Sequence, residues 1–189
     1  LITTPENKSW SNVGKILFLG EWCKLFQARE RWSTLDYKTV PYHWDDRKKF
    51  MSDNIKIESI YEKYLSILAD QLNKIHNENY SIRYWRIVVG LWLRYFIEIV
   101  FDRYESINSA KDCYKIDETW ILKYSLSDWV SLDYEEFHKF NLHDKWNHIL
   151  YSEIIKFLND IPYKIIDSEI LPELKVSNSS YFKAFITNA

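Results

Sequence analysis

The segment KILFL, residues 15–19, is a short apolar run that ends at Gly20. A strand that is covered on both faces reads in this way, as the strands of parallel sheets do. Ligands of open α/β sheets bind beyond the carboxyl ends of such strands. The segment therefore predicts a central strand in an α/β fold, and it makes Glu21, which follows Gly20, a candidate site residue.

Two long helices are expected after this strand. Apolar residues recur at intervals of three and four from about residue 53 to residue 76, which predicts an amphipathic helix. A second helix is expected over about residues 81–106. It is apolar nearly all round, so we expect it to be the most buried element, with Trp92 and Phe96 in the core.

The remaining elements are shorter. Weaker strands are predicted at residues 37–42, 120–124 and 163–166, and helices are expected after the capping residues Asp133 and Asp144. The expected fold is a helix-rich α/β domain in which long helices flank a small, parallel, Rossmann-like sheet. One domain is expected over residues 1–176, followed by a polar tail over residues 177–189.

Composition limits the classes of function. The chain has 189 residues and a formal net charge of −2, so no general attraction to nucleic acid is expected. It has only 3 glycines, and no glycine-rich phosphate-binding motif is found. Cys23 and Cys113 are too few for a disulfide framework, which favours a cytoplasmic location. No signal peptide or transmembrane segment is recognisable, while peripheral membrane contact stays open.

The run YHWDDR, residues 42–47, is unusually dense in ionisable groups. His43, Asp45 and Asp46 are candidates for a general base or for hydrogen bonds to a substrate hydroxyl, and Arg47 is a candidate anion ligand. In the alternative, one aspartate caps the following helix while His43 and Trp44 pack. Both alternatives remain open.

Three arginines share one face of the second long helix. Arg83, Arg86, Gly90 and Arg94 fall within an arc of roughly 80° at about 100° per residue. One interpretation is an anion site in which Gly90 leaves room for phosphate or carboxylate. The other is an internal network of ion pairs with Glu21, Asp45 or Asp46, and both can hold at one site.

Asn147 and His148 complete the candidate set. They stand beside Trp146 near the start of the helix expected after residue 144, in positions from which they could reach a ligand. The predicted catalytic residues are therefore Glu21, His43, Asp45 and Asp46. The predicted substrate-binding or anion-binding residues are Arg47, Arg83, Arg86, Arg94, Asn147 and His148.

Six motifs in order carry a resemblance to a known family: LFLGEWC (17–23), YHWDDR (42–47), LNKIH (72–76), RYWRIVVGLWL (83–93), FDRY (101–104) and WNHILYSEII (146–155). Over about residues 1–160 the chain resembles the N-terminal region of a family of transferases encoded in bacterial O-antigen and other surface-polysaccharide gene clusters. Members of that family are longer and resemble two-lobed glycosyltransferases. The resemblance implies that this chain is the first lobe and that a second lobe binds a nucleotide-sugar. It points to the candidate residues named above other than Arg94.

The leading hypothesis is a transferase of surface-polysaccharide assembly that acts on a sugar or glycan acceptor. A carboxylate or His43 would deprotonate the acceptor hydroxyl, and the arginines would offset phosphate charge. No cofactor is assigned beyond the nucleotide-sugar donor, and no resident divalent metal is expected. A hydrolase with a metal at His43, Asp45 and Asp46 is one alternative. The other is a non-catalytic helical module that docks a partner protein or a lipid-linked glycan through its aromatic side chains.

Overall fold

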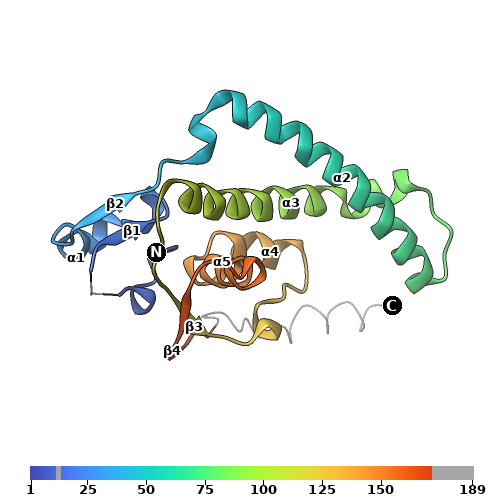
Figure 1. The fold of residues 1–189 in the computed structure, drawn as a ribbon. Coiled ribbons are helices and arrows are strands. Elements are labelled where there is room, and N and C mark those ends of the chain that lie inside the picture. Colours follow the sequence, from blue (N-terminus) through green and yellow to red (C-terminus); the bar gives the residue numbers. More distant parts are fainter. Residues whose placement is uncertain (12–13, 172–189) are drawn as a thin grey trace.

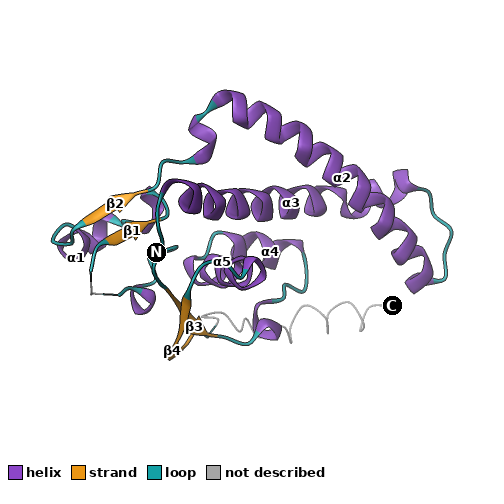
Figure 2. Cartoon of the chain, in the orientation of Figure 1, coloured by secondary structure: helices purple, strands orange, loops and turns teal. Residues whose placement is uncertain are grey.

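The computed structural model describes residues 1–11 and 14–171, in which helices dominate and the strands are short (Figures 1 and 2). The helices are α1 (Arg29–Trp32), α2 (Arg47–His76), α3 (Ile82–Cys113), α4 (Tyr134–Asn141) and α5 (Asp144–Leu158). The strands are β1 (Ile16–Phe18), β2 (Tyr37–Thr39), β3 (Thr119–Lys123) and β4 (Tyr163–Glu169). Short 3-10 turns lie at η1 (Asn7–Ser9), η2 (Glu21–Cys23), η3 (Phe26–Ala28), η4 (His43–Asp45) and η5 (Leu126–Trp129). The expected tail at residues 177–189 lies outside the described residues.

The strands form two separate parallel pairs. β1 pairs with β2, and β3 pairs with β4, each across a connection that contains helix. The helix-rich α/β class is confirmed, whereas the sequence predicts one sheet and the described residues contain two small ones. The long α2–α3 hairpin separates the two strand pairs along the chain (Figure 1).

The prediction that β1 is central is confirmed. β2 lies on one side of β1, and on the other side Ile2 forms a parallel bridge to Phe18. The Ile2 amide donates to the Leu17 carbonyl at 2.8 Å, and the Leu19 amide donates to the Ile2 carbonyl at 2.9 Å. Phe18 and Leu19 are buried, and Leu17 is partly buried. Both edges of β1 are thus paired, as a strand inside a core requires.

Helix α2 begins six residues earlier than the sequence periodicity indicates. The Asp46 carboxylate accepts hydrogen bonds from the amides of Lys48 at 2.8 Å and Lys49 at 3.3 Å, and so caps the helix. An aspartate in this position satisfies amides that have no partner within the helix. At the other end Asn77 takes a left-handed conformation with φ of 53°, which is a common helix stop.

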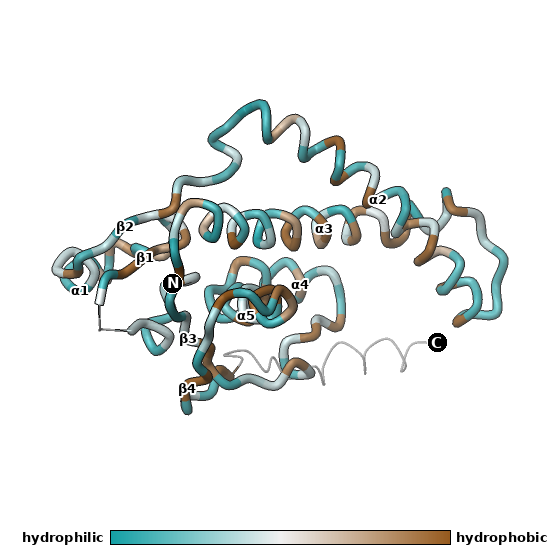
Figure 3. Tube along the Cα trace, in the orientation of Figure 1, coloured by the Kyte–Doolittle hydropathy of each residue, from teal (hydrophilic) through white to brown (hydrophobic). Residues whose placement is uncertain are grey.

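Helix α3 is longer than expected and is not the most buried element. It begins after its cap Ser81 and continues to Cys113, seven residues beyond the expected end. Figure 3 shows hydrophobic and hydrophilic residues alternating along it. Leu93 and Ile97 are buried, but Leu91 is 62% exposed and Phe96 is 37% exposed. The predicted core position of Phe96 is wrong because α2, α4 and α5 cover only part of the circumference of α3.

The main hydrophobic cluster joins segments that are distant in sequence. It contains β1, the C-terminal part of α3, β3 and α5, with Phe18, Ile107, Ile121 and Ile155 all nearly inaccessible. Helix α4 begins as predicted, since the Asp133 carboxylate accepts from the Glu136 amide at 2.8 Å. Asp144, by contrast, is the first residue of α5 and does not cap it.

Candidate functional site

A cleft of about 710 Å³ opens where the chain leaves β1 and β2. This volume lies within the range of small-ligand sites, about 300–1,000 Å³. Its walls come from the segments after β1 and β2, from the C-terminal half of α3, and from α5 with the loop before it. The lining residues are Thr4, Gly20, Glu21, Trp22, Thr39, Val40, Pro41, Tyr42, Asp45, Asp102, Arg103, Asn141, Leu142, Asp144, Asn147 and Tyr151.

A buried carboxylate, Asp102, organises the α3 side of the cleft. Its Oδ1 accepts hydrogen bonds from the Tyr42 hydroxyl at 2.7 Å and from His43 Nε2 at 3.0 Å, and its Oδ2 accepts from Arg103. Because an ionised carboxylate only accepts, His43 carries its proton on Nε2 in this pair. Burial alone would raise the pKa of Asp102, but His43, Arg103 and Tyr42 together hold that pKa below its usual value.

Arg103 connects this carboxylate to α5. Its Nε donates to Asn147 Oδ1 at 3.0 Å, and its guanidinium carbon lies 5.8 Å from the Tyr151 ring centroid. The Asn147 amide is fixed in turn, since its Nδ2 donates to the carbonyls of Asn141 at 2.9 Å and His143 at 3.0 Å. The guanidinium is thus held in one orientation at the wall of the cleft, with a side chain that is 24% exposed.

The cleft is acidic. Four carboxylates, those of Glu21, Asp45, Asp102 and Asp144, line it together with one guanidinium, so its formal charge is −3 when all are ionised. Partial desolvation of the Asp144 carboxyl raises its pKa, and His143 offsets only part of this effect. A carboxylate with a raised pKa is a stronger base than an ordinary one, which makes Asp144 a candidate proton acceptor.

Two further features shape the wall after β1. A Cβ added at Gly20 would lie only 2.2 Å from the Trp22 ring, so only glycine lets this indole fold back over the strand end. The Trp22 indole N–H donates to the Thr3 carbonyl at 3.0 Å, which fixes the ring. The neighbouring Thr4 also borders the cleft, but its hydroxyl is buried and has no hydrogen-bond partner among the described residues.

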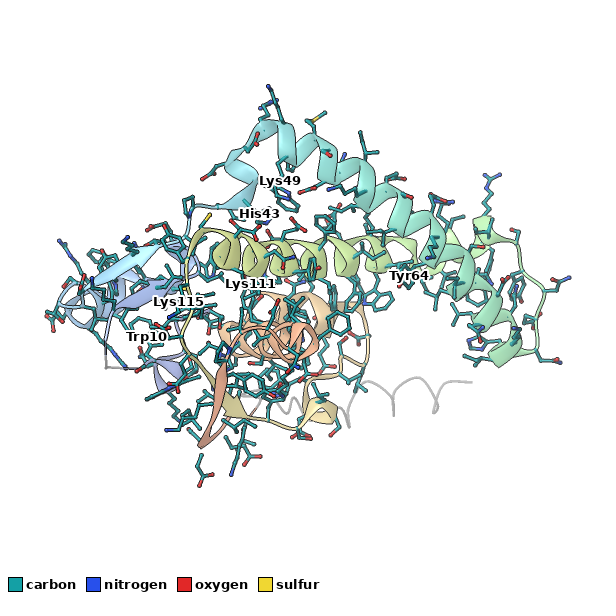
Figure 4. The ribbon with its side chains drawn as sticks, viewed as in Figure 1. Trp10, His43, Lys49, Tyr64, Lys111 and Lys115 are labelled. Atoms are coloured by element: carbon teal, nitrogen blue, oxygen red, sulfur yellow. The ribbon has the colours of Figure 1, made fainter. Side chains whose placement is uncertain are left out.

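Of the residues predicted in the run 42–47, only Asp45 lines the cleft. His43 is 7% exposed and lies below the wall, where it faces α3 through Asp102 (Figure 4). Asp46 caps α2, and Arg47 is exposed in the first turn of that helix. His43 and Asp46 are therefore engaged elsewhere and do not converge with Asp45 on a metal position. Nowhere in residues 1–11 and 14–171 do three or more His, Cys, Asp or Glu side chains form a group that could hold a metal ion.

The predicted pairing of the helix arginines with Glu21, Asp45 or Asp46 is wrong. Arg86 forms two hydrogen bonds to Glu62 on α2, at 2.5 and 2.7 Å. Arg94 pairs with Glu58 on α2 and with Glu98 one turn further along α3.

These arginines therefore join the two helices of the hairpin and do not line the cleft. The space predicted beside Gly90 is filled as well, because a Cβ there would lie 2.7 Å from the Tyr61 hydroxyl. Arg83 is exposed and lies on the same helix, away from the cleft-lining residues.

Asn147 and His148 take different places. Asn147 lines the cleft as predicted, whereas His148 is 1% exposed in the core. His148 Nε2 accepts a hydrogen bond from the Leu122 amide at 3.2 Å and so joins α5 to β3. Burial lowers the pKa of His148 to about 4, so this imidazole is neutral and structural.

The cleft residues absent from the predicted set include Tyr42, Asp102, Arg103 and Asp144. The motif FDRY at residues 101–104 contained the signal, because an Asp-Arg pair in an otherwise apolar stretch of helix needs partners. Tyr42 stands at the start of the run 42–47. Its hydroxyl reaches Asp102 across 60 positions of sequence, a contact that no local pattern could reveal.

Among residues 1–11 and 14–171, no helix has both the length and the apolar character needed to cross a membrane.

Comparisons with known proteins place the chain in a family. No curated protein and no solved structure matches the chain. The family model described as LIC12162 family transferase matches residues 1–189, and the chain therefore belongs to this family of transferases.

Proposed function

We propose that this chain supplies the acceptor-binding lobe of a sugar transferase that acts in bacterial surface-polysaccharide assembly, on the cytoplasmic side of the membrane. The observation that carries the proposal is the composition of the cleft. It offers carboxylates, one fixed guanidinium, amide and hydroxyl groups, and the partly accessible rings of Trp22 and Tyr42. Hydroxyl-rich rings are recognised by this combination of hydrogen-bonding groups and apolar ring faces.

The charge of the cleft decides which substrate it suits. A formal charge of −3 opposes a diphosphate, and its one guanidinium, Arg103, is already paired with Asp102. A neutral or amino-bearing sugar is favoured in its place. The nucleotide-sugar donor is then bound by a second lobe, as the resemblance implies, and the acceptor hydroxyl enters this cleft.

The proposed reaction transfers a glycosyl group to an acceptor hydroxyl. Asp144 accepts the proton of that hydroxyl as its oxygen bonds to the anomeric carbon, and the bond from that carbon to the leaving phosphate breaks. Glu21 and Asp45 accept hydrogen bonds from other hydroxyls of the acceptor. Arg103 is held by Asp102 and Asn147 so that it keeps its position while the acceptor binds.

The alternative hypothesis, a module that docks a partner through its aromatic side chains, requires exposed tryptophans. Trp85 is 5% exposed, and Trp22, Trp44 and Trp92 are each partly buried. The Trp44 indole donates to Asp53 at 3.2 Å, and the Trp85 indole donates to Asn73 at 2.9 Å. The rings of Trp44 and Trp85 therefore support the fold and are poorly placed to anchor a partner.

Nucleotide release by the full-length protein tests the proposal. The protein is incubated with a panel of nucleotide-sugars and with neutral and amino-bearing acceptor glycans. Acceptor-dependent release is expected, and Asp144→Asn should lower kcat by about 10²–10⁴-fold with a smaller change in KM, as expected for loss of a general base. Asp112→Asn, an exposed aspartate on α3 outside the cleft, is the matched control and should keep full activity. No release from any donor, or unchanged kcat in Asp144→Asn, would overturn the proposal.

A further inference from the structure

Helix α3 presents an apolar stripe that the described residues leave open. Its members lie along three turns of the N-terminal half of the helix and are Tyr84 (42% exposed), Ile87 (77%), Val88 (55%), Leu91 (62%) and Tyr95 (45%). Soluble proteins rarely leave a contiguous row of this kind uncovered unless it binds something.

The other sides of this half of α3 are occupied. Leu93 and Ile97 pack against α2 in one cluster. On a second side, Phe137 of α4 contacts Trp92 and Phe96, with ring centroids 6.2 Å apart in both pairs. Figure 1 shows α2 and α4 on different sides of α3. The stripe therefore belongs to a third side, and it is separate from the cleft, which uses Asp102 and Arg103 at the other end of the helix.

The spacing of the stripe favours another helix as its partner. Tyr84, Val88, Leu91 and Tyr95 follow one another at intervals of four, three and four residues. This is the interval pattern of a seam between two packed helices.

The stripe is also symmetric about its own centre, which lies midway between Val89 and Gly90. Tyrosines stand at its two ends, and aliphatic residues stand inside them. A second α3 laid antiparallel across it would place Tyr84 opposite Tyr95 and Val88 opposite Leu91, in each case twice. A surface that is complementary to itself in this way is what a twofold dimer requires.

The charges beside the stripe agree with this arrangement. Arg83 forms no ion pair within the described part of the chain, and it lies on the same flank as Glu98. The antiparallel register brings Arg83 of one copy level with the turn that holds Glu98 of the other. A membrane surface would favour a surplus of free cations here. Arg86 and Arg94, however, are already neutralised by Glu62, Glu58 and Glu98.

We propose that the protein self-associates through this stripe, with two α3 helices packed antiparallel about a twofold axis near Gly90. The seam is short compared with a standard interface of about 1,600 Å². We therefore expect the dimer to depend on protein concentration.

Sedimentation of the full-length protein across a concentration series tests the association. The wild type should pass from monomer to dimer, and Leu91→Glu should shift the midpoint to concentrations at least tenfold higher. Leu91 is exposed, so the variant should melt at the wild-type temperature when both are measured as monomers at low concentration, which confirms that it is folded. Phe157→Glu on α5, also an exposed apolar residue at 83%, is the matched control and should dimerise like the wild type. A wild type that stays monomeric, or equal effects of the two variants, would overturn the proposal.

Cysteine pairs test the register. With Cys113→Ser as background, Tyr84→Cys and Tyr95→Cys are made singly and together. Two positions 11 residues apart lie about 16 Å apart along a helix, whereas a disulfide needs Cα atoms within about 7 Å. Only the double variant, or a mixture of the two single variants, should form covalent dimers. Covalent dimers of each single variant by itself would indicate a parallel seam and contradict the antiparallel register. Sedimentation with lipid vesicles that Leu91→Glu abolishes would show that a membrane takes the place of the second copy.

Discussion

Three donors from two parts of the chain meet one buried carboxylate at Asp102. Tyr42 and His43 arrive from the loop after β2, and Arg103 comes from the adjacent position of α3. We expect Asp102→Asn to cost about 3 kcal/mol in the free energy of unfolding, because the Arg103 charge loses its partner. Urea unfolding at pH 7 measures this loss. A cost below about 1 kcal/mol would show that the carboxylate does not organise this wall.

Asp102 also predicts how the free energy of unfolding depends on pH. The folded state lowers the pKa of Asp102, so its contribution to stability is present above the unfolded pKa of about 3.9 and is lost as pH falls through the folded value. The difference in unfolding free energy between wild type and Asp102→Asn should therefore shrink below about pH 4. A constant difference from pH 7 to pH 3 would contradict the ion pair.

His148 predicts a second loss of stability in acid, at higher pH than that of Asp102. Its pKa is lowered from 6.5 to about 4, so the unfolded imidazole takes up a proton below about pH 6.5 while the folded one does not until about pH 4. Stability should fall by about 2–3 kcal/mol between these values. His148→Gln, whose side chain can still accept from the Leu122 amide, should remove most of this slope. A variant with the same pH profile as the wild type would show that another group titrates.

The residue types in the sequence indicated a polar, aromatic site, but they did not show which side chains line it. Glu21, Asp45 and Asn147 line the cleft because strand ends and the first turns of helices face it, and such positions can be recognised from a pattern. His43, Asp46 and His148 have the same chemistry but are used for internal contacts. Which partner a side chain meets depends on contacts between distant segments, and a single sequence does not encode these in any local form.

At the scale of the element, α3 shows why an apolar composition does not by itself predict burial on every side of a helix. An apolar helix was expected to be buried all round, yet in its N-terminal half α2 and α4 cover two sides and a third side stays open. A matched pair of truncations tests this. Leu93→Ala should cost about 2–5 kcal/mol because Leu93 is 7% exposed, whereas Leu91→Ala, two residues away and 62% exposed, should cost less than about 1 kcal/mol. Urea melts of the monomer at low concentration give both values, and equal costs would mean that the stripe is covered.

The strands were easier to predict than the sheet they build. β1, β2, β3 and β4 all overlap the ranges predicted for strands. β1 has the local signature of a short buried strand, whereas β2 and β4 are exposed or half-buried and have a weaker signature. How strands pair is set by connections, and here each pair closes through its own helical crossover. The long α2–α3 hairpin stands between the pairs in the chain, which explains why one continuous sheet was the wrong expectation for these residues.

At the scale of the whole molecule, the ion-paired arginines of α3 lie in two places. One lies in the cleft, and the others join α3 to α2. Arg103 lies in the cleft and is fixed by Asp102 and Asn147, while Arg86 holds α2 to α3 through Glu62. Replacing each by methionine keeps much of the side-chain volume and removes only the charge. If the cleft binds the acceptor as proposed, Arg103→Met should reduce acceptor-dependent turnover of the full-length protein by at least tenfold, because the cleft loses its cation and Asp102 loses a partner.

Arg86→Met provides the matched comparison on the same helix. Its pair with Glu62 is about half exposed on both sides, at 40% and 45%, and such pairs contribute less than about 1 kcal/mol to stability. Turnover should therefore stay within about twofold of the wild type, and an acceptor that raises the melting temperature of the wild type should raise that of Arg86→Met equally. The acceptor should not stabilise Arg103→Met. If Arg86→Met lost activity while Arg103→Met kept it, the hairpin face and not the cleft would be the site of the reaction.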